Sequence, residues 1–403
     1  MYKLIIKLAF NNAFLRLSRT LLVIIMIAVS MSMMLSIQGL YDGMILNIIE
    51  KTKRSDSGEI SIYAKEYRLS KDLKDNISNA SDIQKALHVR AEIDAVVLRF
   101  KAEGLTATAR KSAFSSIIGI DLKDEERFGA FSEFLKEGEL ILAKRDVLIG
   151  SELAKTLKIK IGSKLIFSTQ DSSGEINAMA LKVKGVIQTN NISLDTSAIY
   201  VDKTKLQKFL GVDEKSATQI AIRTISLALK DELVNEYKNL DVKSFLELYP
   251  MIRQMEDVMV IFNSVTFFIV MMVVFIGIMG VMYVSVLDRI REFGVMKSIG
   301  LAYKMIRLQI FLEALFVGLI GYILGAIMGY GILYYLLHVG LDLSAYADGM
   351  ESFGYSSVIY ADIKLSYFTS TFVAITGASL LSVLLPLRKI KSMNVIEVIK
   401  ADT

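Results

Sequence analysis

Four stretches of the chain carry no Asp, Glu, Lys or Arg over a length that a lipid bilayer requires. They are Thr20–Tyr41 (22 residues), Val258–Leu287 (30 residues), Ala314–Leu341 (28 residues) and Leu365–Leu387 (23 residues). An α-helix rises about 1.5 Å per residue, so about 20 apolar residues cross a hydrocarbon core of about 30 Å. A buried core helix explains one such stretch but not four, and we therefore expect a membrane protein with four transmembrane α-helices.

The short charged segments between these stretches predict the orientation. Lys and Arg predominate in segments 1–19, 288–313 and 388–403, whereas Asp and Glu predominate in segment 342–364. Cytoplasmic segments are enriched in Lys and Arg, so we expect both termini in the cytoplasm. The first apolar stretch follows basic residues, as in a signal peptide, but it is longer than a signal's apolar core and no small-residue cleavage site follows it. We expect an uncleaved anchor.

The long segment after the first apolar stretch alternates strand-like and helix-like stretches with balanced charge. This pattern predicts a large α+β extracytoplasmic domain of two lobes, with a β-rich insertion near 115–215. From Phe245 into the second apolar stretch we expect one continuous helix that contains Pro250. The expected organisation is an amphipathic helix 1–19, transmembrane helices 20–41, 258–287, 305–341 and 365–387, the outer domain 42–257, a short cytoplasmic helix 288–304, an outer loop 342–364 and a cytoplasmic tail 388–403.

The chain carries no recognisable enzyme site. Its nearest approach to a phosphate-binding loop, Gly162–Leu165, lacks the first glycine and the final hydroxyl residue of that motif. There is no Cys, and His88 and His338 are the two histidines, which disfavours a metal or nucleophilic site. The net charge of +5 does not suggest nucleic-acid binding. We expect a non-catalytic chain with no cofactor or metal of its own.

Two segments are more informative. The segment Asp288–Gly300 reads as a short helix that Gly300 could end, and Phe293, Val295, Met296 and Ile299 predict one apolar face for a soluble partner. Anchoring of the helix end at lipid headgroups is the alternative interpretation. The third apolar stretch spaces Gly321, Gly325 and Gly329 by four residues, a pattern that permits close helix contact either within the chain or between two copies.

The sequence resembles a known family, the FtsX/MacB-like ABC permeases, which include the lipoprotein-releasing LolC and LolE subunits. The segment Arg291–Gly300 resembles the family's coupling-helix signature, and 306–321, with Glu313 and Gly318, resembles the stretch that follows it. The end, 386–399, resembles the family's C-terminal tail. Segments 147–154 and 183–187 resemble landmarks of the outer domain.

The resemblance implies a permease of the bacterial inner membrane that pairs with a second permease, either an identical copy or a homologue. ATP and Mg would be bound by a dimer of separate cytoplasmic ATPase subunits, not by this chain. The residues that match the coupling signature, and that would contact the ATPase or shape the helix, are Arg291, Glu292, Phe293, Gly294, Lys297 and Gly300.

The resemblance also implies a cargo. Lipoproteins, or other lipid-anchored molecules, would be extracted from the outer leaflet by force transmitted across the membrane. They would pass through an apolar portal that is in contact with membrane lipid and is formed by Met33, Met34, Ile37 and Leu40. A periplasmic carrier or adaptor would receive them. The hairpin near 170–179 is short and contains no Pro, unlike the carrier-binding hairpin of LolC, and the first apolar stretch is rich in Met and Ser instead of Gly. MacB-type export of peptides or drugs and FtsX-type control of cell-wall hydrolases are the alternative functions.

Overall fold

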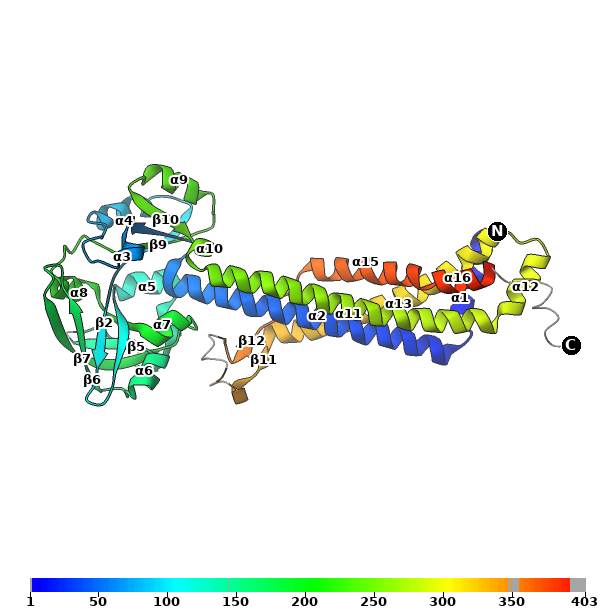
Figure 1. The fold of residues 1–403 in the computed structure, drawn as a ribbon, viewed down its shortest axis with the longest axis horizontal. Coiled ribbons are helices and arrows are strands. Elements are labelled where there is room, and N and C mark those ends of the chain that lie inside the picture. Colours follow the sequence, from blue (N-terminus) through cyan, green and yellow to red (C-terminus); the bar gives the residue numbers. More distant parts are fainter. Residues whose placement is uncertain (1, 144, 347–348, 350–354, 392–403) are drawn as a thin grey trace. The chain divides into compact units, whose positions relative to one another are not determined.

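The computed structural model describes residues 2–143, 145–346, 349 and 355–391 (Figure 1). These residues form two compact units. The helical unit comprises Met1–Met44, Glu256–Asp342 and Val358–Thr403, and the α+β unit comprises Ile45–Met255 and Leu343–Ser357. The predicted tail after Lys391, including most of the C-terminal resemblance, lies outside the described residues.

The helical unit confirms the four predicted apolar helices. Its elements are α1 (Tyr2–Ala13), α2 (Leu17–Thr52), α11 (Pro250–Asp288), α12 (Ile290–Ser298), α13 (Tyr303–His338), β11 (Leu341–Asp342), β12 (Val358–Ile359), α15 (Leu365–Ser382) and α16 (Leu384–Lys391). By length and composition, α2, α11, α13 and the α15–α16 segment can each cross a membrane. Their buried side chains form one cluster that includes Ile27, Ile278, Ile310 and Ile375, one from each of the four.

The glycines of α13 pack against α2 of the same chain. A Cβ atom on Gly321 would lie 2.8 Å from the Cβ of Ile27, and one on Gly325 would lie 2.9 Å from the Cβ of Met31. A Cβ on Gly329 would lie 2.6 Å from a methyl group of Leu35. Two helices therefore approach closely along a stripe that only glycine permits, in the way that small residues do in membrane helices.

The last apolar stretch is not one continuous helix. Helix α15 ends at Ser382 and α16 begins at Leu384. Pro386 has no backbone N–H, so it leaves the carbonyl of Ser382 without its helical partner four residues on. A helix commonly bends or breaks at such a position.

The α+β unit is built on a ten-stranded mixed sheet. Its strands are β1 (Ile60–Ala64), β2 (Ile93–Ala107), β3 (Ser112–Ile120), β4 (Leu135–Gly138), β5 (Asp146–Gly150), β6 (Lys164–Gln170), β7 (Ile176–Ile187), β8 (Ala198–Asp202), β9 (Gln219–Thr224) and β10 (Leu240–Ser244). Its helices are the π-helix η1 (Lys53–Ser57), α3 (Tyr67–Ser70), α4 (Ala80–His88), α5 (Leu122–Gly129), η2 (Phe131–Phe134), α6 (Ser151–Leu157), α7 (Ile192–Ser197), α8 (Lys203–Leu210), α9 (Leu229–Glu236), α10 (Phe245–Leu248) and η3 (Ser344–Tyr346).

The sheet has the two lobes that the sequence predicts. The strand order is β10-β1-β9-β2-β3-β8-β5-β7-β4, and β6 pairs with both β2 and β7. One lobe packs β10, β1, β9 and the first half of β2 against α4 and α9. The other packs β3, β5, β6, β7 and β8 against α6 and α8. The 15-residue strand β2 belongs to both lobes, and the second lobe is an insertion between β2 and β9.

The predicted continuous helix from Phe245 into the second apolar stretch is wrong. Helix α10 ends at Leu248, Tyr249 has φ −120° and ψ 65°, and α11 begins at Pro250. The ring of a proline disfavours helical backbone in the preceding residue, whereas proline fits well at the first position of a helix. Pro250 therefore starts α11 and does not lie inside it.

A buried network of charges occupies the α+β unit. Arg99 of β2 pairs through two nitrogens with the carboxylate of Glu125 in α5, at 2.5 Å and 2.6 Å, and both side chains are 2% exposed. Asp56, in the π-helix that follows α2, accepts a hydrogen bond from Lys101 at 2.6 Å and another from the hydroxyl of Tyr249. The network therefore ties the residue before α11 and the segment after α2 to one strand.

Candidate functional site

The short helix α12 follows a sharp break in the chain. Arg289 separates it from α11 with φ −113° and ψ 20°, values outside the α-helical region. Glu292 lies in its first turn and Lys297 in its last, where each charge is favoured by the helix dipole. After α12, Gly300 has φ +91° and the N–H of Leu301 donates to the carbonyl of Met296 at 3.0 Å. A glycine in this left-handed conformation closes the helix.

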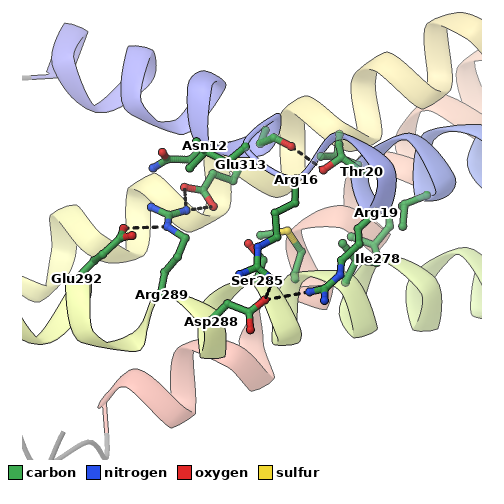
Figure 2. A pocket seen from close by; sticks show the side chains of 16 residues that line it. Asn12, Arg16, Arg19, Thr20, Ile278, Ser285, Asp288, Arg289, Glu292 and Glu313 are labelled. Atoms are coloured by element: carbon green, nitrogen blue, oxygen red, sulfur yellow. Dashed lines mark hydrogen bonds and ion pairs between the residues drawn. The ribbon is translucent and has the colours of Figure 1, made fainter. Parts of the chain in front are cut away.

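Arg289 is held by a buried ion pair. Its Nη1 atom lies 3.1 Å and 3.4 Å from the two carboxylate oxygens of Glu313 on α13, and its Nε atom donates to Glu292 at 3.0 Å (Figure 2). Gln309 donates to the same Glu313 carboxylate at 3.2 Å, and the guanidinium lies 5.3 Å from the centre of the Phe293 ring. Glu313 is 3% exposed, so this pair fixes the start of α12 to α13 inside the protein.

A second group of charges joins α2 to the end of α11. Arg16 and Arg19 both donate to the carboxylate of Asp288, the latter at 2.9 Å (Figure 2). The hydroxyl of Thr20 donates to the carbonyl of Ala13 at 2.6 Å, which holds the turn between α1 and α2. Between the two groups of charges lies a cavity of about 220 Å³ with an apolar wall from α2, α11 and α13.

The structure divides the predicted apolar face of α12. Phe293 and Gly294 are buried against the helical unit, whereas Val295 is 47% exposed and Ile299 is 80% exposed. Positions four residues apart share a helix face, so the two exposed residues form one apolar ridge that points away from Phe293. The prediction of a single face that includes all four residues is therefore wrong, because Phe293 anchors the helix and a different face remains open.

The remaining residues that were predicted to couple to an ATPase lie on the surface of α12 or just after it. Arg291, Glu292, Lys297 and Gly300 are all exposed. Glu292 also contacts Arg289, so it belongs both to the ion-pair group and to the open surface.

The four predicted portal residues do not share one environment. Met33 is exposed on the helical unit, Ile37 and Leu40 are half-buried, and Met34 is 1% exposed. Met34 is buried in the helical unit whereas Met33 is exposed, because neighbouring residues of a helix point in directions about 100° apart. The portal itself stays a prediction.

Sequence reasoning did not identify the Arg289–Glu313 pair. The sequence does contain one indication of the pair, since Glu313 is the acidic residue directly before an uncharged stretch of 28 residues. An ionisable residue at the start of such a stretch requires a partner. The partner lies 24 positions earlier in the chain, across a turn between helices, and spacing alone does not indicate it.

Two protein families match the chain. The family described as MacB-like periplasmic core domain matches residues 20–240, and the family described as FtsX-like permease C-terminal matches residues 264–395. The ABC transporter permease YtrF of Bacillus subtilis (strain 168) is 22% identical over 80% of this chain and 83% of YtrF. The macrolide export ATP-binding/permease protein MacB of Escherichia coli is 24% identical over 89% of this chain, which spans about half of that relative (55%).

Solved structures of outer domains are also similar. The extracellular domain of the noncanonical ABC-type transporter YknZ from Gram-positive bacteria has a TM-score of 0.32 and 13% identity, covering 46% of this chain and 98% of that domain. The periplasmic region of MacB from Actinobacillus actinomycetemcomitans has a TM-score of 0.34 and 16% identity, covering 48% of this chain and 92% of that region.

The two family matches follow one another along the chain and together extend from residue 20 to residue 395. The MacB-like match alone covers more than half of the 403 residues. The chain therefore belongs to the MacB/FtsX family of ABC transporter permeases.

Proposed function

We propose that this permease takes energy from a separate cytoplasmic ATPase dimer through α12 and uses it to move lipid-anchored cargo from the outer leaflet of the inner membrane. The observation that carries the proposal is the apolar ridge of Val295 and Ile299. It stands on a helix whose base is fixed by a buried ion pair, so a force applied to α12 reaches α13 directly. Both termini and α12 face the cytoplasm in this proposal, and two permease chains act together.

The ATPase contact predicts the effect of one substitution. Ile299→Asp places a charge in the centre of the proposed contact, where burial of an unpaired carboxylate is strongly unfavourable. We expect the amount of copurifying ATPase to fall at least tenfold, with loss of the ATP hydrolysis that the permease stimulates. The measurement is affinity purification of the full chain from its native host, followed by an ATPase assay.

Ile225→Asp is the matched control, because Ile225 is 82% exposed on the α+β unit and lies outside the proposed contact. This control should retain the ATPase. Equal ATPase recovery with Ile299→Asp and wild type would contradict the assignment of α12 as the coupling element.

Lipoproteins are the cargo class that we propose first. Support comes from α11, the apolar helix with the smallest buried share of the four at 17%, whose outward side chains include Ile261, Val265, Phe268 and Met272. An apolar helix that is open along one side suits cargo that approaches within the membrane. The alternative, MacB-type export of peptides or drugs, is supported by the similarity to MacB over most of the chain.

Depletion of the permease separates these two cargo classes. If it releases lipoproteins, depletion in the native host should make them accumulate in the inner-membrane fraction, as quantified by mass spectrometry of separated membranes. An unchanged lipoprotein distribution together with increased sensitivity to macrolides would support export instead. Restoration by wild-type protein, but not by Ile299→Asp, would link the result to ATPase coupling.

A further inference from the structure

A groove on the helical unit lies between α11 and α16. Its lining comes from these two helices alone, namely Met279, Gly280, Tyr283, Leu385, Arg388 and Lys389, and it encloses about 680 Å³. The residues on each helix lie one, three or four positions apart, so each helix contributes one face. This groove is separate from the cavity beside Arg289.

Two residues create the space. Gly280 has no side chain, and a Cβ atom built on it would meet no heavy atom within 4 Å. On the other side of the groove, the helix breaks before Pro386, so α16 does not continue α15 as one straight helix. Met279 and Leu385 provide an apolar wall, so the inner part of the groove suits a hydrocarbon chain.

The polar end of the groove lies where both apolar stretches end. Leu287 is the last residue of the uncharged stretch in α11, and Arg388 is the first charged residue after the uncharged stretch of the last span. Tyr283 lies one turn before the end of α11, a position that aromatic residues favour at the headgroup level of a bilayer. The groove therefore runs from the hydrocarbon level to the headgroup level.

Arg388 supplies an unused positive charge at this level. It makes no hydrogen bond or ion pair with any residue in the part of the chain that the structure describes. Lys389 also lines the groove, and the lining contains no Asp or Glu. A guanidinium group binds phosphate oxygens through two parallel hydrogen bonds, which makes it well suited to a phosphate headgroup.

We propose that this groove binds one anionic phospholipid from the leaflet on the α12 side of the membrane. The phosphate contacts Arg388, and one acyl chain lies over Gly280 beside Met279 and Leu385. The site goes beyond the proposed transport function, because lipid binding at this place requires neither ATP, nor an ATPase partner, nor cargo.

The test is native mass spectrometry of the full chain, purified in mild detergent and mixed with phosphatidylglycerol or phosphatidylcholine. The wild type should retain one phosphatidylglycerol per chain in preference to phosphatidylcholine. Arg388→Gln should weaken phosphatidylglycerol binding about fivefold, the change expected when one cation near an anionic membrane surface is removed. Gly280→Leu should prevent binding of either lipid at this site, because its side chain fills the space for the acyl chain.

Matched controls keep these results specific. Arg307→Gln removes the same charge from an exposed position near the start of α13, and Gly331→Leu adds the same side chain where a Cβ atom would also meet open space. Both controls should bind phosphatidylglycerol like the wild type. Equal binding of the two lipids by the wild type, or unchanged binding by Arg388→Gln and Gly280→Leu, would overturn the proposal.

Two further experiments test whether the groove holds something other than a lipid, namely a free anion or a second protein chain. Inorganic phosphate should not displace the lipid, because it has no acyl chain, and displacement by phosphate alone would reduce the site to a simple anion site and overturn the proposal. The chain has no natural Cys, so Gly280→Cys introduces a single thiol. Efficient disulfide formation between two copies through this thiol in native membranes would show a protein occupant and overturn the lipid assignment.

Discussion

Replacement of Arg289 by Met should destabilise the helical unit by about 3–5 kcal/mol, the effect of removing one member of a buried ion pair. The substitution leaves the Glu313 carboxylate inside the protein without its cation, with neutral hydrogen-bond partners such as Gln309 and Asn12. Glu313→Leu alone should have a similar effect, because it leaves the Arg289 guanidinium half-paired. The measurement is thermal unfolding of the full chain in detergent, followed by far-UV circular dichroism.

The double variant Arg289→Met/Glu313→Leu provides the decisive comparison. Removing both charges together leaves no unpaired group, so most of the lost stability should return. Arg19→Met is the control, since its side chain is 47% exposed and Asp288 retains Arg16, and it should change stability by less than about 1 kcal/mol. Single variants as stable as wild type would show that the pair does not hold α12 in place.

Arg99→Met should have the largest effect in the α+β unit, again about 3–5 kcal/mol, because it leaves the buried Glu125 carboxylate without its cation. Burial alone would lower the pKa of the Arg99 guanidinium, but the carboxylates of Glu125 and Asp56 together raise that pKa above its usual value. The charge therefore persists at every physiological pH. Resistance of the α+β unit to trypsin in increasing urea, measured on the full chain, reports the loss.

Lys101→Met is the comparison within the same network. Lys101 is 18% exposed, and its partner Asp56 keeps the hydrogen bond from Tyr249, so we expect a smaller loss of about 1–2 kcal/mol. Equal effects of the two substitutions would indicate that the network is held by Asp56 and not by the Arg99–Glu125 pair.

Much of the fold could be predicted because it is encoded locally. The absence of charge over 22 or more residues identifies a membrane helix without reference to the rest of the chain, and alternating apolar residues identify long strands such as β7. Short strands such as β10 contain too few residues for this pattern to identify them. Strand β10 has one buried residue, Val242, and exists because it pairs with β1, which is a contact between distant segments.

The candidate site also has a part that the local sequence predicts and a part that depends on distant contacts. The position of α12 was predictable from its charges and from Gly300, but the orientation of its faces was not. Phe293 and Ile299 are both apolar in the sequence, but the buried cluster of the helical unit that includes Phe293 is made by residues far away in the chain. The Arg289–Glu313 pair likewise depends on how two helices pack.

The glycine contact between α13 and α2 has a consequence for natural variation in this family. A Cβ atom at position 325 would lie 2.9 Å from the Cβ of Met31 and 3.0 Å from the backbone of Ala28, so a larger residue fits only if α2 moves away or Met31 is replaced by Gly. Positions 325 and 31 should therefore vary together among homologues, as pairs in spatial contact do. Helices α2 and α13 would then be inherited as a matched pair, whereas the open side of α11 would be free to diverge with the lipid or cargo that each relative meets.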